Sequence, residues 1–143
     1  MKRQVFTILV SLSLLLVSVH AQSSSTIVVA NIPFDFIVRD KTFSAGEYTL
    51  TRVGQSVTLL RSRDCNATMV FQTNTVQAAK TRNELIFHRR GDKYFLSQVW
   101  TAGSTIGSEL RKCRTEQNLL LEKISKADGT PELETVSVLA RLR

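Results

Sequence analysis

Two short alternating segments joined by a tight turn limit the folds open to this chain more than any other feature. Residues 84–89 and 93–101 are rich in aromatic and β-branched side chains, and Arg90-Gly91-Asp92 lies between them. Glycine supplies the positive φ that tight hairpin turns require. These residues predict a β-hairpin whose heaviest apolar side chains are Leu85, Phe87, Tyr94, Leu96 and Trp100.

The same alternation returns along most of the chain. It predicts strands over residues 32–38, 47–53, 56–61, 68–76 and 134–141, separated by turns rich in Gly, Asn, Asp and Ser. About seven or eight short antiparallel strands of this kind indicate an all-β domain, either a small β-sandwich or a β-barrel.

The periodicity changes from two to helical near Ser108. Ser108 can serve as an N-cap with Glu109 in the first turn, and Asp128-Gly129 with Pro131 would end the helix. The sequence therefore predicts one C-terminal α-helix before the last strand. Its apolar stripe consists of Leu110, Cys113, Leu120, Leu121 and Ile124.

The N-terminus has the three parts of a secretory signal peptide. Lys2 and Arg3 precede an apolar run over residues 5–19, and Ala21 is a small residue suited to cleavage before Gln22. A run of about 15 residues is shorter than the roughly 20 that span a bilayer. We expect residues 1–21 to be removed, leaving one secreted or periplasmic domain over residues 22–143 with no stable membrane span.

Net charge limits the class of partner. The formal charge is +7, and loss of Lys2 and Arg3 leaves about +5. A basic domain suits an anionic envelope component, while export argues against nucleic acid. Because the positive residues are scattered through predicted strands, turns and helix, we expect an ordinary solvated surface. The partner, an anionic component or a small ligand, stays unknown at this point.

Metal and catalytic chemistry find little support in the residue types. Residues 22–143 contain one histidine, His88, and two distant cysteines, so no zinc-type spacing occurs and no cofactor is predicted. We interpret His88 as a strand residue facing solvent. A hydrolase with dispersed carboxylates such as Asp35 and Glu47 remains an alternative, but the preferred interpretation is a protein without enzymatic activity.

The small-residue loop before the predicted helix is a weak candidate for anion binding. Backbone amides at a helix N-terminus favour anions, and hydroxyl groups add further donors. An ordinary flexible turn followed by an N-cap is the competing interpretation. The candidate residues are Gly103, Ser104, Thr105, Gly107 and Ser108.

Two further features leave alternatives open. An oxidising compartment permits a disulfide between Cys65 and Cys113, although Cys113 also fits the apolar helix stripe as a free thiol. Phe36, Phe87 and Trp100 fit a packed core, but in a barrel they could instead line an apolar cavity. The second alternative would make the protein a carrier of small apolar ligands.

Three segments of the chain resemble a family of small exported bacterial proteins without an assigned activity. The resemblance implies a bacterial protein in a periplasmic or extracellular setting, and it offers no catalytic residues to transfer. Its members tend to have serine in place of Cys113, which weakens the case for the disulfide. The expectation is a non-catalytic binding or structural protein of the envelope. The segments are NIPFDF (31–36), AGEYT (45–49) and residues 88–103.

Overall fold

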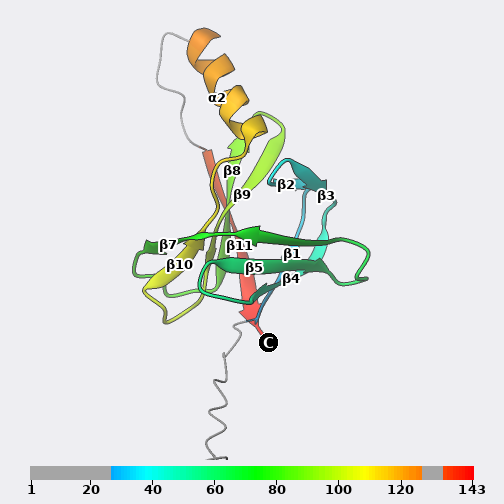
Figure 1. Cartoon of the computed structure of the whole chain (residues 1–143), viewed down its shortest axis with the longest axis vertical. Coiled ribbons are helices and arrows are strands. Elements are labelled where there is room, and N and C mark those ends of the chain that lie inside the picture. Colours follow the sequence, from blue (N-terminus) through cyan, green and yellow to red (C-terminus); the bar gives the residue numbers. More distant parts are fainter. Residues whose placement is uncertain (1–26, 127–133) are drawn as a thin grey trace, which may run out of the picture.

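The computed structural model describes residues 27–126 and 134–143, which fold into a curled, half-barrel β-sheet (Figure 1). One helix in these residues, α2, projects from one end of the sheet and precedes the last strand. The predicted mostly β fold with a single C-terminal helix is therefore confirmed. The elements are β1 (Ile27–Ile32), β2 (Phe36–Val38), β3 (Lys41–Phe43), β4 (Gly46–Arg52), β5 (Val57–Ser62), β6 (Thr68–Gln72), β7 (Asn74–Gln77), β8 (Glu84–Arg90), β9 (Lys93–Trp100), β10 (Ile106–Glu109), α2 (Arg114–Lys126) and β11 (Glu134–Leu142).

The curl of the sheet brings β7 and β9 together on either side of β10. The main strand order is β3-β2-β9-β8-β11-β1-β4-β5-β6, and β10 pairs with both β9 and β7. Only Thr73 separates β7 from β6, so the end of the sheet turns back toward β9. All pairs are antiparallel except β2 with β9.

The structure has 11 strands, more than expected, because two predicted strands are each divided and two more, β3 and β10, form where no strand was predicted. Residues 32–38 contribute the end of β1 and all of β2, which lie at different places in the sheet, and Pro33 lies between them. Proline has no N–H for a strand ladder, which favours a break there. Residues 68–76 divide between β6 and β7.

Aromatic side chains fill the inner face of the half-barrel. Phe36 and Phe87 are both 0% exposed, and their ring centroids lie 5.7 Å apart in an edge-on arrangement. Tyr48 meets Phe36 edge-on at 5.0 Å. Full burial of such a side chain contributes about 1.5–3 kcal/mol. The alternation that places these residues inside places their neighbours on the outer face.

The helix begins later than the sequence suggested. Ser108 lies in β10, opposite Thr75 of β7 and Val99 of β9, and α2 starts only at Arg114. The predicted helix start at Ser108 is therefore wrong. Sheet pairing outweighs the local capping signal there, since the Leu110 amide also donates to the Ser97 carbonyl. The predicted stop signals at residues 128–131 lie outside the described residues.

The cap of α2 comes from a distant turn. Asp40 in the β2–β3 turn accepts hydrogen bonds from the backbone amide and the side-chain hydroxyl of Thr115, the former at 2.9 Å. These bonds lower the pKa of the Asp40 carboxyl below its usual value. Arg39 and Asp40 have φ of 48° and 66°, as in a type I′ hairpin turn. The turn thus joins β2 to β3 and anchors the start of α2.

Candidate functional site

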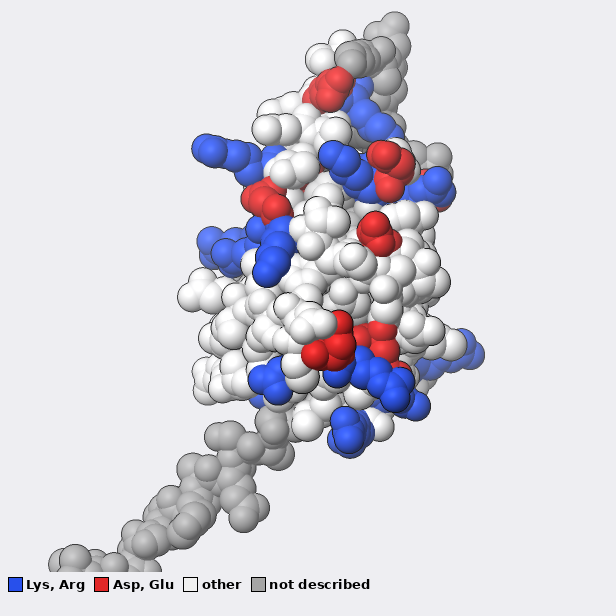
Figure 2. Space-filling view, turned by 90° about the vertical axis from the view of Figure 1, so that its right-hand side faces the viewer, with Lys and Arg blue, Asp and Glu red and all other residues white. Residues whose placement is uncertain are grey.

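A groove on the outer face of the sheet is the strongest candidate for a binding site. It runs over β11, β1, β4 and β5, on the side opposite the aromatic core, and has a volume of about 900 Å³. Small-molecule sites usually measure about 300–1,000 Å³. Figure 2 shows positive and negative side chains gathered at the lower end of the molecule, where Figure 1 places the end of β11.

Four arginines flank the groove in two pairs. Arg61 lies in β5 and Arg63 in the turn after it, while Arg141 lies in β11 and Arg143 directly follows that strand. The strand ladders continue through Arg63 and Arg143, whose amides donate to the Glu47 and Ile27 carbonyls, and all four arginines line the groove. The groove therefore has a positive wall on each side.

Strand register determines how far apart the walls stand. Arg141 lies beside Val29, Val29 beside Thr49, and Thr49 beside Arg61. Arg61 and Arg141 therefore occupy one row, separated by three steps between strands, or roughly 14 Å at the backbone. Arg143 donates its backbone amide to the Ile27 carbonyl, which places it in the next row.

Glu47 is the one acidic side chain among the residues that line the groove. Its carboxylate accepts a hydrogen bond from Arg141 at 3.1 Å and lies 3.8 Å from Arg63. Among the ion pairs of the described residues, none involves Arg61 or Arg143. The lining side chains thus carry a net charge of +3, with two guanidinium groups free of any acidic partner in residues 27–126 and 134–143.

The floor of the groove combines hydroxyl and aliphatic groups. Thr49 and Thr51 alternate along β4, and they stand beside Val29, Ile27 and Leu59 on the neighbouring strands. Thr49, Thr51, Ile27 and Leu59 are half-buried, whereas Val29 is 4% exposed. A ligand in the groove would meet both hydrogen-bonding and apolar surface between the charged walls.

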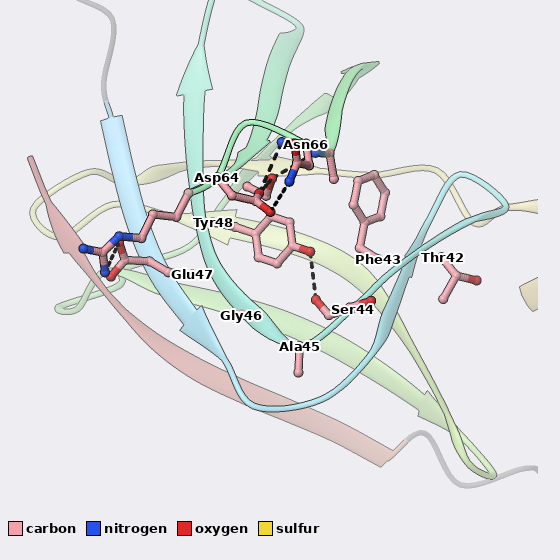
Figure 3. A pocket seen from close by; sticks show the side chains of 12 residues that line it. Thr42, Phe43, Ser44, Ala45, Gly46, Glu47, Tyr48, Asp64 and Asn66 are labelled. Atoms are coloured by element: carbon pink, nitrogen blue, oxygen red, sulfur yellow. Dashed lines mark hydrogen bonds and ion pairs between the residues drawn. The ribbon is translucent and has the colours of Figure 1, made fainter.

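A second pocket adjoins the groove at Glu47, Ser62 and Arg63, which line both. It measures about 630 Å³ and lies between the β3–β4 and β5–β6 turns. Figure 3 shows the Tyr48 hydroxyl directed at Ser44, and the Asp64 carboxylate at Asn66.

The polar groups of this second pocket serve structural roles. Tyr48 donates to the Ser44 carbonyl at 2.8 Å, and burial, with the charges of Asp64 and Asp35, raises the pKa of its hydroxyl. Asp64 accepts bonds from Ser62 and Asn66, which lower the pKa of its carboxyl. Such an arrangement holds the β5–β6 turn. Because the pKa of Asp64 is lowered and that of Tyr48 is raised, neither group is suited to acid–base catalysis or nucleophilic attack at neutral pH.

The two carboxylates considered for a hydrolase, Asp35 and Glu47, both have hydrogen-bond or ion-pair partners in the structure. Asp35 accepts a hydrogen bond from the backbone amide of Ala45 at 2.8 Å, and Glu47 pairs with Arg63 and Arg141. Neither geometry presents a free acid–base pair, so the structure adds no support to the hydrolase alternative.

The loop predicted to bind anions is a connection between two strands. Gly103 has φ of 74° in the turn, and the Ser104 hydroxyl bonds to both the amide and the carbonyl of Ile106. Ser108 accepts a hydrogen bond from Arg52, and Thr105 accepts the Ala78 amide through its carbonyl. The helix N-terminus on which this site depended lies at Arg114 instead, so that reason for anion binding is wrong.

The residues proposed to line an apolar cavity pack into the interior. Phe36 and Phe87 contact each other, and Trp100, 1% exposed, packs against Gly107 so closely that a Cβ there would lie 2.7 Å from the indole ring. This packing gives the apolar-carrier alternative no support.

The two cysteines are free thiols in the structure. Cys65 is exposed in the β5–β6 turn with φ of 60°. Cys113 precedes α2, where burial raises the pKa of its thiol, so it is a poor nucleophile at neutral pH. The disulfide considered from the sequence is not formed.

Contrary to the prediction, His88 does not face solvent. Its Nδ1 lies 2.8 Å from the Glu116 carboxylate of α2, and the two side chains are 13% and 5% exposed. Arg90, two residues along β8, is 4% exposed, and its Nε and one terminal nitrogen have no hydrogen-bond partner. The sequence could not reveal this pair because α2 packs on β8 only in the folded chain.

The groove itself was missed because only folding brings its walls together. The sequence contains a local signal, since Arg61-Ser62-Arg63 and Arg141-Leu142-Arg143 each alternate along a predicted strand or its end. Their proximity depends on β11 pairing with β1, and β4 with β5.

Metal sites and membrane-spanning helices are both lacking in the part of the chain that the structure describes. Residues 27–126 and 134–143 contain no group of three or more His, Cys, Asp or Glu side chains that could hold a metal ion. Within the same residues, no helix is long and apolar enough to cross a membrane.

Comparison with known proteins adds no further guide to the site. No protein-family model matches the chain, and neither curated proteins nor solved structures show significant similarity to it.

Proposed function

We propose that this protein is a non-catalytic binding domain that recognises an anionic ligand in the groove between Arg61/Arg63 and Arg141/Arg143. The observation that carries the proposal is the convergence of four arginines and one glutamate on a single groove of about 900 Å³. Guanidinium groups bind carboxylate, sulfate and phosphate through paired hydrogen bonds.

The two arginines without acidic partners supply most of the expected affinity. Arg61 and Arg143 have no ion pair among the described residues, so a ligand anion need not displace one to reach them. Hydrogen bonds to charged groups contribute about 1.5–3 kcal/mol, and about 1.4 kcal/mol corresponds to a tenfold change in affinity. The export predicted from residues 1–21 is consistent with an anionic component of the envelope as ligand.

Titration calorimetry with polyanions tests this function. The purified protein is titrated with polyphosphate and with dextran sulfate, and with uncharged dextran as the neutral control. We expect the polyanions to bind and dextran not to bind. The double variant Arg61→Gln/Arg143→Gln should lose at least tenfold in affinity.

A matched control separates the groove from general charge. Arg82 and Lys123 are exposed and lie outside the groove, so Arg82→Gln/Lys123→Gln lowers the net charge by the same amount. The control variant should bind like the unmodified protein. Equal weakening of the two double variants, or no binding of either polyanion, would contradict the proposed function.

A further inference from the structure

We infer that the ligand of the arginine groove is an extended acidic polysaccharide, an inference that rests on the proposed anion-binding function. Three features of the groove support this chemical class: the spread of its charges, the composition of its floor, and its continuation into a pocket lined by polar groups. The first argues against a small anion, and the other two argue against a polyanion without sugar rings.

The charges are spread too widely for one small anion. The backbones of Arg61 and Arg141 stand roughly 14 Å apart across the strands. Arg63 donates its amide to the Glu47 carbonyl, whereas Arg143 donates its amide to the Ile27 carbonyl, at the other end of the lining. These rows lie four positions apart along β1 or β4, or roughly 13 Å along the strands. The positive groups therefore form a diagonal band that suits repeated charges on a chain.

The floor suits a sugar ring better than a bare polyanion. Beneath the band lie the threonines of β4 and the aliphatic side chains of Ile27, Val29 and Leu59. A sugar acid presents carboxylates, hydroxyls and an apolar C–H face, which match the guanidinium, hydroxyl and aliphatic groups of the groove. Polyphosphate matches the charges and hydroxyls but offers nothing to pack on Leu59.

The pocket of Figure 3 extends the polar surface beyond the groove. Glu47, Ser62 and Arg63 line both, and Thr42, Ser44 and Asn66 continue the lining with exposed hydroxyl and amide groups. Asp64 and Glu47 make this end less positive than the groove. A polymer with neutral hydroxyls between its charges can cross such a surface, whereas a uniformly charged one is repelled by Asp64.

The test compares polymers that differ in chemistry at equal charge. Polygalacturonate oligomers and a sparsely sulfated dextran supply carboxylated and sulfated polysaccharides with neutral hydroxyls between the charges, and polyphosphate of the same charge supplies a polyanion without sugar. Titration calorimetry should rank both polysaccharides above polyphosphate. Galacturonic acid alone should bind at least tenfold more weakly than its oligomer, because it reaches only part of the band. Tighter binding of one polysaccharide identifies whether carboxylate or sulfate is the preferred anion.

A pair of matched variants probes the apolar floor. Leu59 and Val70 face each other across β5 and β6 on the outer surface, but only Leu59 lines the groove. We expect Leu59→Thr to weaken polysaccharide binding by about three- to fivefold and to leave polyphosphate binding unchanged. Val70→Thr, at a side chain 60% exposed, should leave both unchanged, and far-ultraviolet circular dichroism verifies the fold of each variant.

The possible outcomes separate failure of the polysaccharide inference from failure of the proposed anion-binding function. If polyphosphate binds as tightly as the polysaccharides, or if Leu59→Thr weakens polyphosphate and polysaccharide alike, the ligand is not a polysaccharide. In that case a retained dependence on Arg61 and Arg143 would leave the anion-binding function standing. If binding of every polyanion is indifferent to Arg61 and Arg143, both the function and the inference fail.

Discussion

Replacing Asp40 tests how the distant β2–β3 turn holds the start of α2. Its carboxylate satisfies the amide of Thr115, one of the first amides of a helix that have no partner within the helix. Three substitutions separate the contributions of this residue: Asp40→Gly, Asp40→Ala and Asp40→Asn.

Two effects set the expected magnitudes. Loss of a capping side chain costs about 0.5–2 kcal/mol, and Asp40→Gly shows this loss alone because glycine accepts the φ of 66°. Asp40→Ala adds roughly 1 kcal/mol, since an ordinary side chain is strained in the left-handed region. Asp40→Asn keeps an acceptor and tolerates this φ, so it should cost least.

Urea unfolding followed by far-ultraviolet circular dichroism measures the series. We expect the order of stability unmodified > Asn > Gly > Ala at neutral pH. Equal stability of Asp40→Gly and the unmodified protein would refute the capping role. Equal stability of Asp40→Ala and Asp40→Gly would refute the backbone reasoning.

The pH dependence of the same series has a definite sign. Folding lowers the pKa of the Asp40 carboxyl through its bonds to Thr115. The charged carboxylate therefore stabilises the fold above its unfolded pKa of about 3.9, and this stabilisation is lost as pH falls through the lower folded pKa. The stability gap between the unmodified protein and Asp40→Asn should be constant near neutral pH and should narrow below about pH 4.

Three further substitutions test the core and the groove. Gly107→Ala should cost about 1–3 kcal/mol in urea unfolding and alter the fluorescence of Trp100, because the added Cβ would lie 2.7 Å from the indole; unchanged stability and emission would contradict the packing. Phe87→Ala should cost about 3–5 kcal/mol by the same measurement, and a cost below about 1 kcal/mol would mean that its site is not a packed core. Glu47→Gln should raise polyanion affinity in calorimetry, because it releases the two arginines that Glu47 pairs with; a lower affinity would show that Glu47 positions them.

The sequence predicted the parts of the fold that depend on local alternation. The hairpin over residues 84–101 forms as β8 and β9. The strands predicted over residues 47–53 and 134–141 are β4 and β11, and each end of these strands lies within one residue of its predicted position. These segments carry their own turn and periodicity signals, so no distant partner is needed to recognise them.

Long-range pairing accounts for what the sequence did not predict. Ser108 has the composition of an N-cap, yet pairing with β7 and β9 makes it part of a strand. His88 gains Glu116 as a partner 28 positions away. Both outcomes depend on residues distant in sequence, which a local pattern does not contain.

The candidate site follows the same division. Each Arg-x-Arg pair is visible in the sequence as two residues on one strand face, but the groove exists only because β1 and β4 lie between the pairs. Arginines that are scattered along the sequence can therefore gather at one place on the folded surface.

The register that buries the core also creates the groove. Arg61 lines the groove on the outer face because its neighbour Leu60 faces the core, where Leu60 is 0% exposed. Since side chains alternate between faces, a slip of one residue in β5 would turn Arg61 inward and Leu60 outward. Burying an unpaired guanidinium costs far more than exposing a leucine, so the hydrophobic core selects the outward arginines. The positive walls are thus fixed by the packing on the opposite face of the same strand, which holds their backbone positions before any ligand binds.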